Sequence, residues 1–240
     1  MSGCRLEVCV DDAAGVDAAV AGGADRIELC AALATGGLTP PPGLMAYAAK
    51  APIPVYAMIR PWAGGFVFDA GGIDTMLWDI DAARRAGLAG VVLGANLPDG
   101  RLDAELLRRL AAHAEGLGLT LHRAFDLVPD FTEALETAIE IGFERILTSG
   151  GQTSAVAGID ALAEIVAHSA GRLSIMPGSG VSIANAGLLR QRLGVDELHS
   201  SCSVAVREEN ARLVSMGFCG EKARHTDAAT VRALKESLSA

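Results

Sequence analysis

The sequence has few aromatic residues and no concentration of positive charge. Phe, Trp and Tyr make up 4% of the 240 residues, so alanine and the aliphatic side chains must fill the core. There are 20 Lys and Arg against 29 Asp and Glu, which gives a net charge of −9, and the basic residues form no run. We therefore expect neither a nucleic acid nor an anionic membrane surface as a partner.

Long apolar segments and targeting signals are also missing. No segment stays apolar for the roughly 20 residues that a membrane-spanning helix requires. The first residues, MSGCRLEVCV, lack the charged region and the apolar region of a signal peptide. These absences predict a cytoplasmic protein with no membrane partner.

The cysteines and histidines lack the spacing of the common disulfide and metal motifs. The five cysteines are an odd number at irregular intervals, and no C-x-x-C pair occurs. We expect reduced thiols, most of them buried as small apolar side chains. No H-x-H, H-x-x-x-H or H-E-x-x-H pattern is present, so spacing alone does not indicate a metal.

The dominant feature is an alternation of short β-type runs with alanine-rich helical stretches. Several helical stretches close on glycine, the usual residue after a helix C-terminus. The pattern predicts an α/β fold, a TIM-type (β/α)8 barrel that forms a single domain over residues 1–240. A doubly wound open sheet explains eight evenly spaced repeats less well. The predicted strands are 5–10, 26–30, 55–60, 90–95, 119–125, 145–151, 172–180 and 197–202.

Two segments depart from this repeat. Residues 31–54 contain three consecutive prolines where the second helix belongs, so we expect that helix to be short or displaced. Residues 203–226 follow the eighth strand and should emerge at the C-terminal face of the barrel. They are interpreted as a lid, an interface or a passive surface loop.

Strand parity places charged side chains inside the predicted barrel. Side chains alternate between the two faces of a strand, and one set is uniformly apolar, so this set should face the helices. An inert interior would consist mainly of Val, Ile and Leu, and active sites of such barrels lie at the C-terminal ends of the strands. We therefore favour a catalytic or ligand-binding site over a self-paired polar plug. The inward residues of this predicted site are Glu7, Glu28, Arg60, His122 and His199.

Asp126 follows the fifth strand in the stretch LHRAFDL and is a further candidate catalytic residue. It is expected either to orient the site or to cap the next helix. Carboxylates and imidazoles together permit general acid–base chemistry, and they also bind divalent metals. The residues do not choose between these two roles.

Glycine-rich loops follow the sixth and seventh strands, with the sequences TSGG and PGSG. Backbone N–H groups in such loops, together with a helix N-terminus, bind phosphate in many barrels. The alternative is a pair of tight turns that need glycine for backbone reasons. The candidate anion-binding residues are Ser149, Gly150, Gly178, Ser179 and Gly180.

A soft-metal site is also compatible with the parity. Cys9, Cys30, Met58 and Met176 all point inward, and thiolates and thioethers suit Cu(I). Cysteine and methionine are equally common as core residues that fill gaps. Parity therefore permits a copper site but does not require one.

Nine short motifs spread over residues 5–203 make the sequence resemble the CutC family, which is named for copper homeostasis. The resemblance implies a TIM-type barrel, a cytoplasmic location, a homo-oligomer (a dimer or a tetramer) and a role in copper tolerance or Cu(I) binding. It also implies copper binding by cysteine, which corresponds here to Cys30 and Cys9. The motifs are LEVC, RIELC, GGLTP, PVYAMIRP, PDGRLD, LTLHRAFD, RILTSGG, IMPGSG and ELHSS.

The sequence departs from the family pattern in two loops. Trp62 and Gly65 stand where the family usually has a second arginine and an acidic residue. The loop PGSG stands where the family more often has three consecutive glycines. Both changes lie near the predicted site but leave its inward residues unchanged.

We predict a cytoplasmic copper homeostasis protein that binds Cu(I) or acts in copper tolerance. The alternative is a barrel enzyme that uses acid–base chemistry on a small anionic or phosphorylated metabolite, with only an indirect link to copper. A scaffold whose barrel serves oligomer contacts is a third reading. The residues alone leave open whether the protein is an enzyme.

Overall fold

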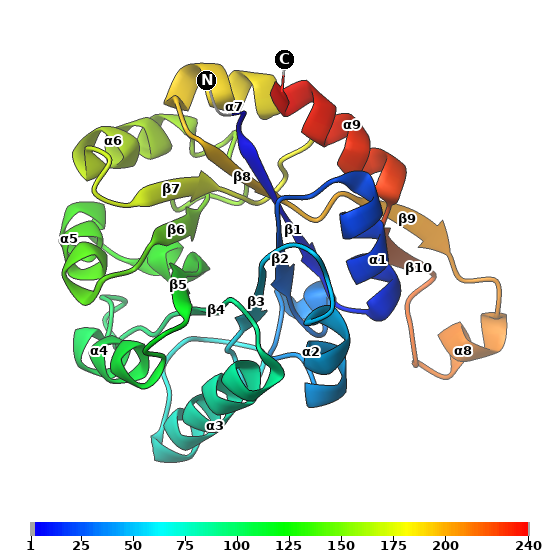
Figure 1. Cartoon of the computed structure of the whole chain (residues 1–240), viewed down its shortest axis with the longest axis horizontal. Helices are drawn as coiled ribbons and strands as arrows, with labels where there is room; N and C mark the ends of the chain where they lie inside the picture. Colours follow the sequence, from blue (N-terminus) through cyan, green and yellow to red (C-terminus); the bar gives the residue numbers. More distant parts are fainter. Residues whose placement is uncertain (1–2, 240) are drawn as a thin grey trace.

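The structure is a computed structural model that describes residues 3–239, and it contains a barrel of parallel strands inside a ring of helices (Figure 1). The hydrogen-bonded order is β7-β6-β5-β4-β3-β2-β1-β8, and β7 and β8 lie side by side, so the barrel is nearly closed. This confirms the predicted TIM-type fold. The strands are β1 Arg5–Val10, β2 Arg26–Leu29, β3 Val55–Met58, β4 Gly90–Leu93, β5 Gly118–Leu121, β6 Arg145–Thr148, β7 Ser174–Pro177 and β8 Glu197–Ser200.

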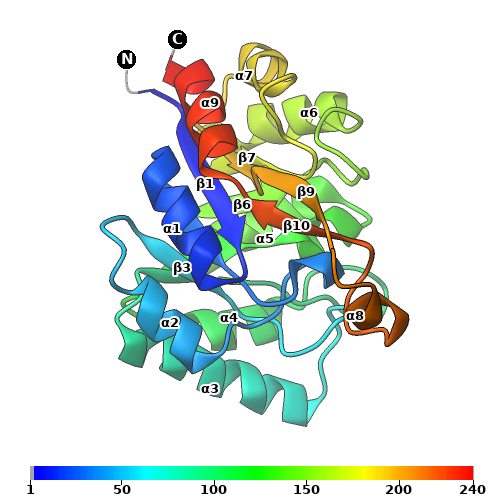
Figure 2. The ribbon, with the colours of Figure 1, turned by 90° about the vertical axis from the view of Figure 1, so that its right-hand side faces the viewer.

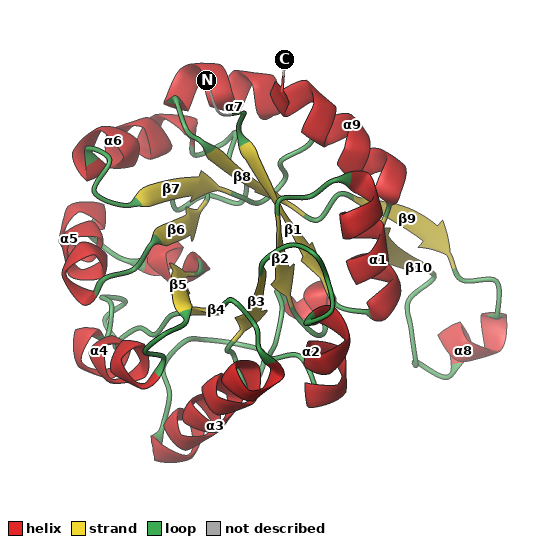
Figure 3. Cartoon of the chain, viewed as in Figure 1, coloured by secondary structure: helices red, strands yellow, loops and turns green. Residues whose placement is uncertain are grey.

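Helices alternate with the strands along the chain, as the colouring by secondary structure shows (Figure 3). Short 3₁₀ turns, η1 Leu33–Thr35 and η2 Arg123–Leu127, follow β2 and β5. None of the helices within residues 3–239 combines the length and apolar character needed to cross a membrane. The helices are α1 Ala13–Gly22, α2 Pro42–Ala48, α3 Ala70–Ala86, α4 Ala104–His113, α5 Phe131–Ile141, α6 Ile159–Ser169, α7 Ala186–Leu193, α8 Ala211–Ser215 and α9 Ala228–Ser239.

Aspartate and glycine set the ends of several helices. Asp12 and Asp130 accept hydrogen bonds from backbone N–H groups in the first turns of α1 and α5, which otherwise lack partners. Gly23 and Gly142 follow the same two helices in the left-handed conformation and return N–H groups to the last carbonyls. These local signals explain why the repeat was visible in the sequence.

The second helix is short, as predicted. Pro41 precedes α2 and Pro42 is its first residue, so the helix begins only at the last of the three prolines and extends for 7 residues. The chain between β2 and α2 forms η1 and a bridge between Ala31 and Leu38. This segment therefore lies over the C-terminal end of the barrel, where its residues reach the interior.

The two faces of the strands differ in character, as strand parity predicts. Leu6, Val8 and Ile27 are fully buried in the apolar layer between the strands and the helices. The opposite face contributes buried charged residues, such as Glu7 and Arg26, to the barrel interior. The predicted strands extended too far at their C-terminal ends. The residues that immediately follow β4, β6 and β7, which are Gly94, Ser149 and Gly178, are buried like strand residues but lie outside the strands.

Residues 203–226, which the sequence left as a lid, interface or loop, form an arm outside the barrel. The strands β9 (Ser203–Arg207) and β10 (Lys222–Thr226) pair as an antiparallel hairpin, and α8 lies between them in sequence. The arm projects beyond the helix ring next to α1 (Figures 1 and 2). The chain then returns to the barrel as α9, which packs against α1 and α7.

The contact between α1 and α9 depends on a glycine, and we expect Gly22→Ala to destabilise the fold by about 1–3 kcal/mol, the usual effect of overpacking. A Cβ at Gly22 would clash with Val231 and lie 2.8 Å from the Ala228 carbonyl oxygen. Urea denaturation measures the effect. Gly187→Ala on α7 is the matched control, because its Cβ would meet nothing within 4 Å. Equal stabilities of the two variants would contradict this account of the α1–α9 contact.

Candidate functional site

The N-terminal half of the barrel interior is a layer of mutually paired charges. The Arg26 guanidinium forms ion pairs with Glu7 and with Glu197, the latter at 2.5 Å, and all three residues are buried. Arg145 lies 3.3 Å from Glu197 and donates to Thr120 at 2.9 Å. The layer is self-paired, but it shares only Glu7 with the five inward residues for which the sequence allowed a polar plug. It lies towards the N-terminal ends of the strands, below the other four.

Glu7 belongs to this layer and connects it to the site above. Burial opposes ionisation, but Arg26 and His199 outweigh it and lower the pKa of Glu7 to about 2. Its second oxygen, Oε1, lies 2.8 Å from Nδ1 of His199. Glu7 therefore orients His199, and it does not line the cavity above.

A cavity of about 280 Å³ opens at the C-terminal ends of the strands, where active sites of such barrels lie. It brings together four of the six predicted catalytic residues, Glu28, Arg60, His122 and His199, together with Cys9. The remaining lining comes mainly from loops: Leu33, Gly36, Met58, Phe66, Arg123, Leu147 and Ser179.

One side of this cavity is a cluster of possible metal ligands. The Cys9 thiol, the Glu28 carboxylate and the His199 imidazole place one ligand atom each within 4.8 Å of the others, and all three residues are buried. Strand register explains the cluster, because Cys9 on β1 pairs with Glu28 on β2, and Glu7 pairs with His199 on β8. The sequence paired Cys9 with Cys30, whereas this group joins Cys9 to Glu28 and His199.

Cys30 lies one hydrogen bond away from the cluster. Its thiol donates to Oε2 of Glu28 at 3.5 Å, and its side chain packs with Tyr56, Met58 and Val92. Burial raises the pKa of the Cys30 thiol well above its ordinary value, and the Glu28 carboxylate raises it further. Cys30 is therefore expected to stay protonated in this position.

The protonation of the cluster follows from its surroundings. Burial favours neutral histidine, but Cys9, Glu28 and Glu7 outweigh it and raise the pKa of His199 well above its ordinary value. Burial raises the pKa of Glu28, whose Oε1 atom has no hydrogen-bond partner within residues 3–239. His199 Nε2 lies 3.8 Å from the other Glu28 oxygen, so both groups face the same space.

Another part of the cavity wall is formed by Arg60 and His122. Both side chains pack against the Phe66 ring. The Arg60 Cζ atom lies 5.0 Å from the centroid of this ring, and the centroid of the His122 ring lies 4.7 Å from it. Gly94 leaves room for the imidazole, since a Cβ there would lie 2.5 Å from the His122 ring. Burial and the Arg60 charge lower the pKa of His122 to about 3, so the imidazole is neutral.

Asp126, predicted as a catalytic or capping residue, holds the loop after β6. Its carboxylate accepts hydrogen bonds from the backbone N–H groups of Ser149 and Gly151, both at 3.0 Å, and from the Thr148 hydroxyl at 2.6 Å. Arg123 donates to the same carboxylate at 2.6 Å. Asp126 does not line the cavity, and its role in this structure is that of a positioning residue.

The two glycine loops differ in their free donors. In the loop after β6, Asp126 takes the Ser149 N–H and Thr148 Oγ1 takes the Gly150 N–H, so neither predicted anion-binding residue has a free backbone donor. In the loop after β7, Gly178 donates its N–H to Thr148, whereas the N–H groups of Ser179 and Gly180 make no hydrogen bond with residues 3–239. The N–H groups of Ser149 and Gly150 after β6 therefore already have acceptors within the chain. The loop after β7 remains a candidate for anion binding.

The sequence missed the residues that loops bring into the cavity. Phe66 and Leu33 come from irregular segments after β3 and β2, which have no periodicity to reveal them. Arg145 and Leu147 on β6 could have been found, because they share the inward parity. Trp62 packs edge-on against Phe68 and does not line the cavity.

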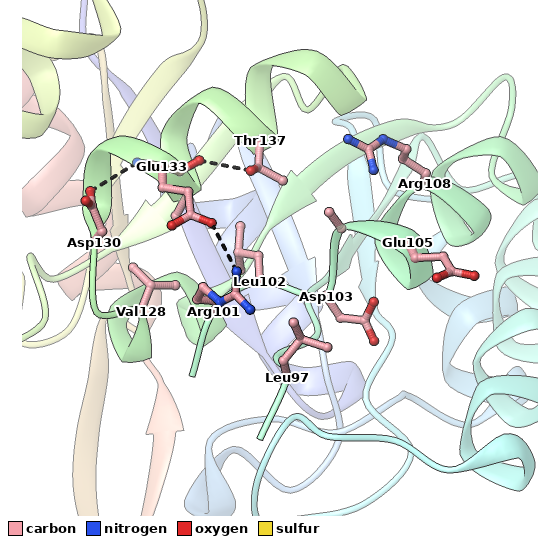
Figure 4. A pocket seen from close by; sticks show the side chains of 12 residues that line it. Leu97, Arg101, Leu102, Asp103, Glu105, Arg108, Val128, Asp130, Glu133 and Thr137 are labelled. Atoms are coloured by element: carbon pink, nitrogen blue, oxygen red, sulfur yellow. Dashed lines mark hydrogen bonds and ion pairs between the residues drawn. The ribbon is translucent and has the colours of Figure 1, made fainter. Parts of the chain in front are cut away.

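A larger hollow of about 360 Å³ lies outside the barrel, between α4 and α5 (Figure 4). Most of its charged side chains form ion pairs or hydrogen bonds within the chain. Asp130 accepts from the Glu133 N–H at 3.1 Å, and Arg101 lies 3.8 Å from the Glu133 carboxylate. No buried unpaired polar atom of the described residues lines this hollow, so it offers a weaker site than the barrel cavity.

Comparison with known proteins agrees with the fold and the motifs. The family model described as CutC family matches residues 4–204. A CutC family protein of Sinorhizobium medicae is 61% identical over 98% of this chain and 96% of its own length. One of Caulobacter vibrioides is 54% identical over 98% of this chain and 97% of its own length.

A solved structure shares the architecture. The crystal structure of a Streptococcus agalactiae protein named for copper homeostasis, CutC, has a TM-score of 0.79 and 30% identity, and the match covers 82% of this chain and 98% of that chain. Family model, relatives and structure thus agree with one another. The chain belongs to the CutC family.

Proposed function

We propose that the protein acts in copper homeostasis by binding Cu(I) between the Cys9 thiolate and Nε2 of His199, with Glu28 as the third group. The observation that carries this proposal is the buried cluster in which their ligand atoms lie within 4.8 Å of one another. Thiolate and imidazole are ligands that suit Cu(I), whereas an isolated carboxylate suits harder cations.

Glu7 supports this proposal as the outer partner of His199. Histidine ligands of metals commonly donate their other ring N–H to a carboxylate, which fixes the tautomer and the ring orientation. The 2.8 Å contact between His199 Nδ1 and Glu7 Oε1 is of this kind and leaves Nε2 facing the cluster. Metal binding at Nε2 would displace a proton, as would binding at the Cys9 thiol, so copper uptake should release protons.

An anaerobic titration of the reduced protein with Cu(I), against a competing chelator, tests the proposal. We expect tight binding of one ion per chain. Weak binding of several ions per chain would contradict it. A parallel titration with Zn²⁺ is informative, because Cys, His and Glu also bind zinc, and tighter binding of Zn²⁺ would reassign the site.

We also propose a cytoplasmic location, in which the thiols stay reduced. All five cysteines are free, and four of them, Cys4, Cys9, Cys30 and Cys202, are buried. Disulfides are rare in the cytosol and common in secreted proteins. A fractionation of cells that express the protein, with cytosolic and membrane markers, tests this location.

The resemblance to the family also implies a homo-oligomer, and the arm of residues 203–226 supports it. Five large apolar side chains on the arm are exposed: Val204 at 39%, Val206 at 46%, Leu213 at 39%, Met216 at 61% and Phe218 at 76%. We expect Phe218→Asp to lower the molar mass in size-exclusion chromatography with light scattering. Trp78→Asp on α3, also at an exposed apolar residue, is the control. If Phe218→Asp leaves the molar mass of the oligomer unchanged, the arm does not form the oligomer interface.

A further inference from the structure

Arg60 is a buried cation without a counterion in the described part of the chain. Its residue is 6% exposed, and no carboxylate oxygen of residues 3–239 lies within 4.0 Å of its guanidinium. The two terminal nitrogens donate to three backbone carbonyls, those of Thr35, Gly37 and Gly64, at 2.8–3.0 Å. Because arginine carries five N–H donors, two remain uncommitted, and one of them is Nε–H, which has no partner.

His122, which lines the same cavity, carries a second unused donor. Its Nδ1 atom accepts the Ala124 backbone N–H at 3.1 Å, which assigns the ring proton to Nε2. Nε2 has no hydrogen-bond partner within residues 3–239, and the residue is 3% exposed. A buried donor without an acceptor is costly, as is a buried charge without a counterion, so both groups point to a missing acceptor that is negatively charged.

We propose that Arg60 and His122 bind the carboxylate group of a small, singly charged organic molecule whose body fills the barrel cavity. The cavity of about 280 Å³ admits only a small molecule, and Leu33, Met58, Phe66 and Leu147 give it an apolar wall. Arginine binds carboxylates with two parallel N–H donors, and the neutral imidazole adds a third from Nε2. This site uses none of the residues Cys9, Glu28 and His199 and does not depend on copper.

A carboxylate fits these donors better than a phosphate. One positive charge, that of Arg60, is uncompensated on this side of the cavity, and one negative charge balances it. A phosphate dianion carries more charge than Arg60 alone balances and needs more donors. The loop after β6 has its N–H groups bound to Asp126, so only the two free N–H groups of Ser179 and Gly180 after β7 could add to those of Arg60 and His122. Arg123 lines the cavity too, but Asp126 already pairs with its guanidinium.

Calorimetric titration of the metal-free, reduced protein tests this inference with three probes. Butyrate is the carboxylate, butyramide is its neutral isostere, and inorganic phosphate is the competing anion. We expect saturable binding of butyrate at one molecule per chain, no binding of butyramide, and weaker binding of phosphate. The 15N resonances of the His122 ring should shift on butyrate addition, because Nε2–H gains an acceptor.

Two conservative variants separate recognition from folding. His122→Asn keeps a side-chain oxygen that can accept the Ala124 N–H but removes the Nε2–H donor. Arg60→Lys keeps the charge but removes the guanidinium fork. We expect each variant to weaken butyrate binding by about tenfold or more, as for a lost hydrogen bond to a charged group. His168→Asn, at an exposed histidine on α6, serves as the control for folding and solvent effects.

The outcomes separate the possible ligands. No saturable butyrate binding to the folded wild type would overturn the inference. Equal binding of butyramide, or tighter binding of phosphate than of butyrate, would also overturn it. Because the protein carries no copper in these titrations, failure here leaves the Cu(I) titration to decide the proposed function separately.

Discussion

Replacing Arg26 by methionine should lower the free energy of unfolding by about 3–5 kcal/mol, the usual cost of removing one partner from a buried ion pair. Arg26 is 4% exposed, and it pairs with both Glu7 and Glu197 at the N-terminal layer of the barrel. Methionine fills a similar volume, so the main effect is to leave two buried carboxylates without their common cation. Urea denaturation measures the loss.

An exposed arginine pair provides the control for Arg26→Met. Arg172 donates to both oxygens of Glu136 at 2.6 and 2.7 Å, a geometry as close as that of the buried pair, but at the surface. We expect Arg172→Met to change stability little, because solvent and salt screen exposed ion pairs. If the two variants lost similar amounts of stability, the buried ion pairs of Arg26 would not stabilise the barrel more than an exposed pair does, which would contradict this account.

The loss in Arg26→Met should depend on pH in a defined direction. Arg26 and His199 lower the pKa of Glu7 from 4.5 to about 2, so its contribution to stability is present above the unfolded value and is lost as the pH falls towards 2. Without Arg26, burial should raise the same pKa, and protonation then relieves the unpaired charge. The difference between wild type and variant should therefore shrink on acidification.

Replacing Cys9 by alanine should nearly abolish Cu(I) binding, whereas replacing Cys30 should not. Outer-shell partners of metal ligands contribute about 10–100-fold to affinity, so loss of a direct ligand should exceed about 100-fold. Cys9 belongs to the cluster with Glu28 and His199, while Cys30 only donates a hydrogen bond to Glu28. Because that hydrogen bond is long, at 3.5 Å, we expect Cys30→Ala to cost only about tenfold, the lower end of the range for an outer-shell partner.

The measurement is the chelator-competition titration, carried out on both variants and on Glu7→Gln. Glu7→Gln keeps the shape of the side chain but weakens the partner of His199, so we expect an intermediate loss, about 10–100-fold. Circular dichroism and urea denaturation must show each variant folded. A Cys30→Ala variant that loses Cu(I) while Cys9→Ala retains it would show that the cluster identified here is not the copper site.

The sequence was sufficient for the fold and for the direction of the strand side chains. Aspartate and glycine at the helix ends, and apolar residues such as Leu6 and Val8 on one strand face, are local signals that the chain obeys. Parity therefore identified Glu28 and His199 as inward-facing before any coordinates. These inferences succeed because each depends on residues that are close in sequence.

Parity could not predict the height of a side chain within the barrel, that is, its position along the barrel axis. Glu7 and Glu28 have the same inward parity, yet Glu7 lies in the paired layer with Arg26, and Glu28 lies in the cavity. The height depends on strand register, which pairs Glu7 with Arg26 and Cys9 with Glu28. Register is a long-range property, so no single strand reveals it.

Interactions between loops were equally hidden. The glycine loop after β6 is typical of an anion site, but its N–H groups bind Asp126, a residue from the preceding loop. Conversely, nothing in the sequence around Arg60 indicates an anion site. Only the structure shows that its guanidinium has backbone partners but no carboxylate partner within residues 3–239. Both observations concern partners that come from other segments of the chain.

X-ray absorption at the copper edge of the Cu(I)-loaded protein is the most direct test of the central claim. A shell that contains both sulfur and a histidine nitrogen, unchanged in Cys30→Ala and lost in Cys9→Ala, is the result that the Cys9–His199 site predicts. A shell of sulfur alone, which requires Cys9 and Cys30 together and leaves His199 unused, would contradict it.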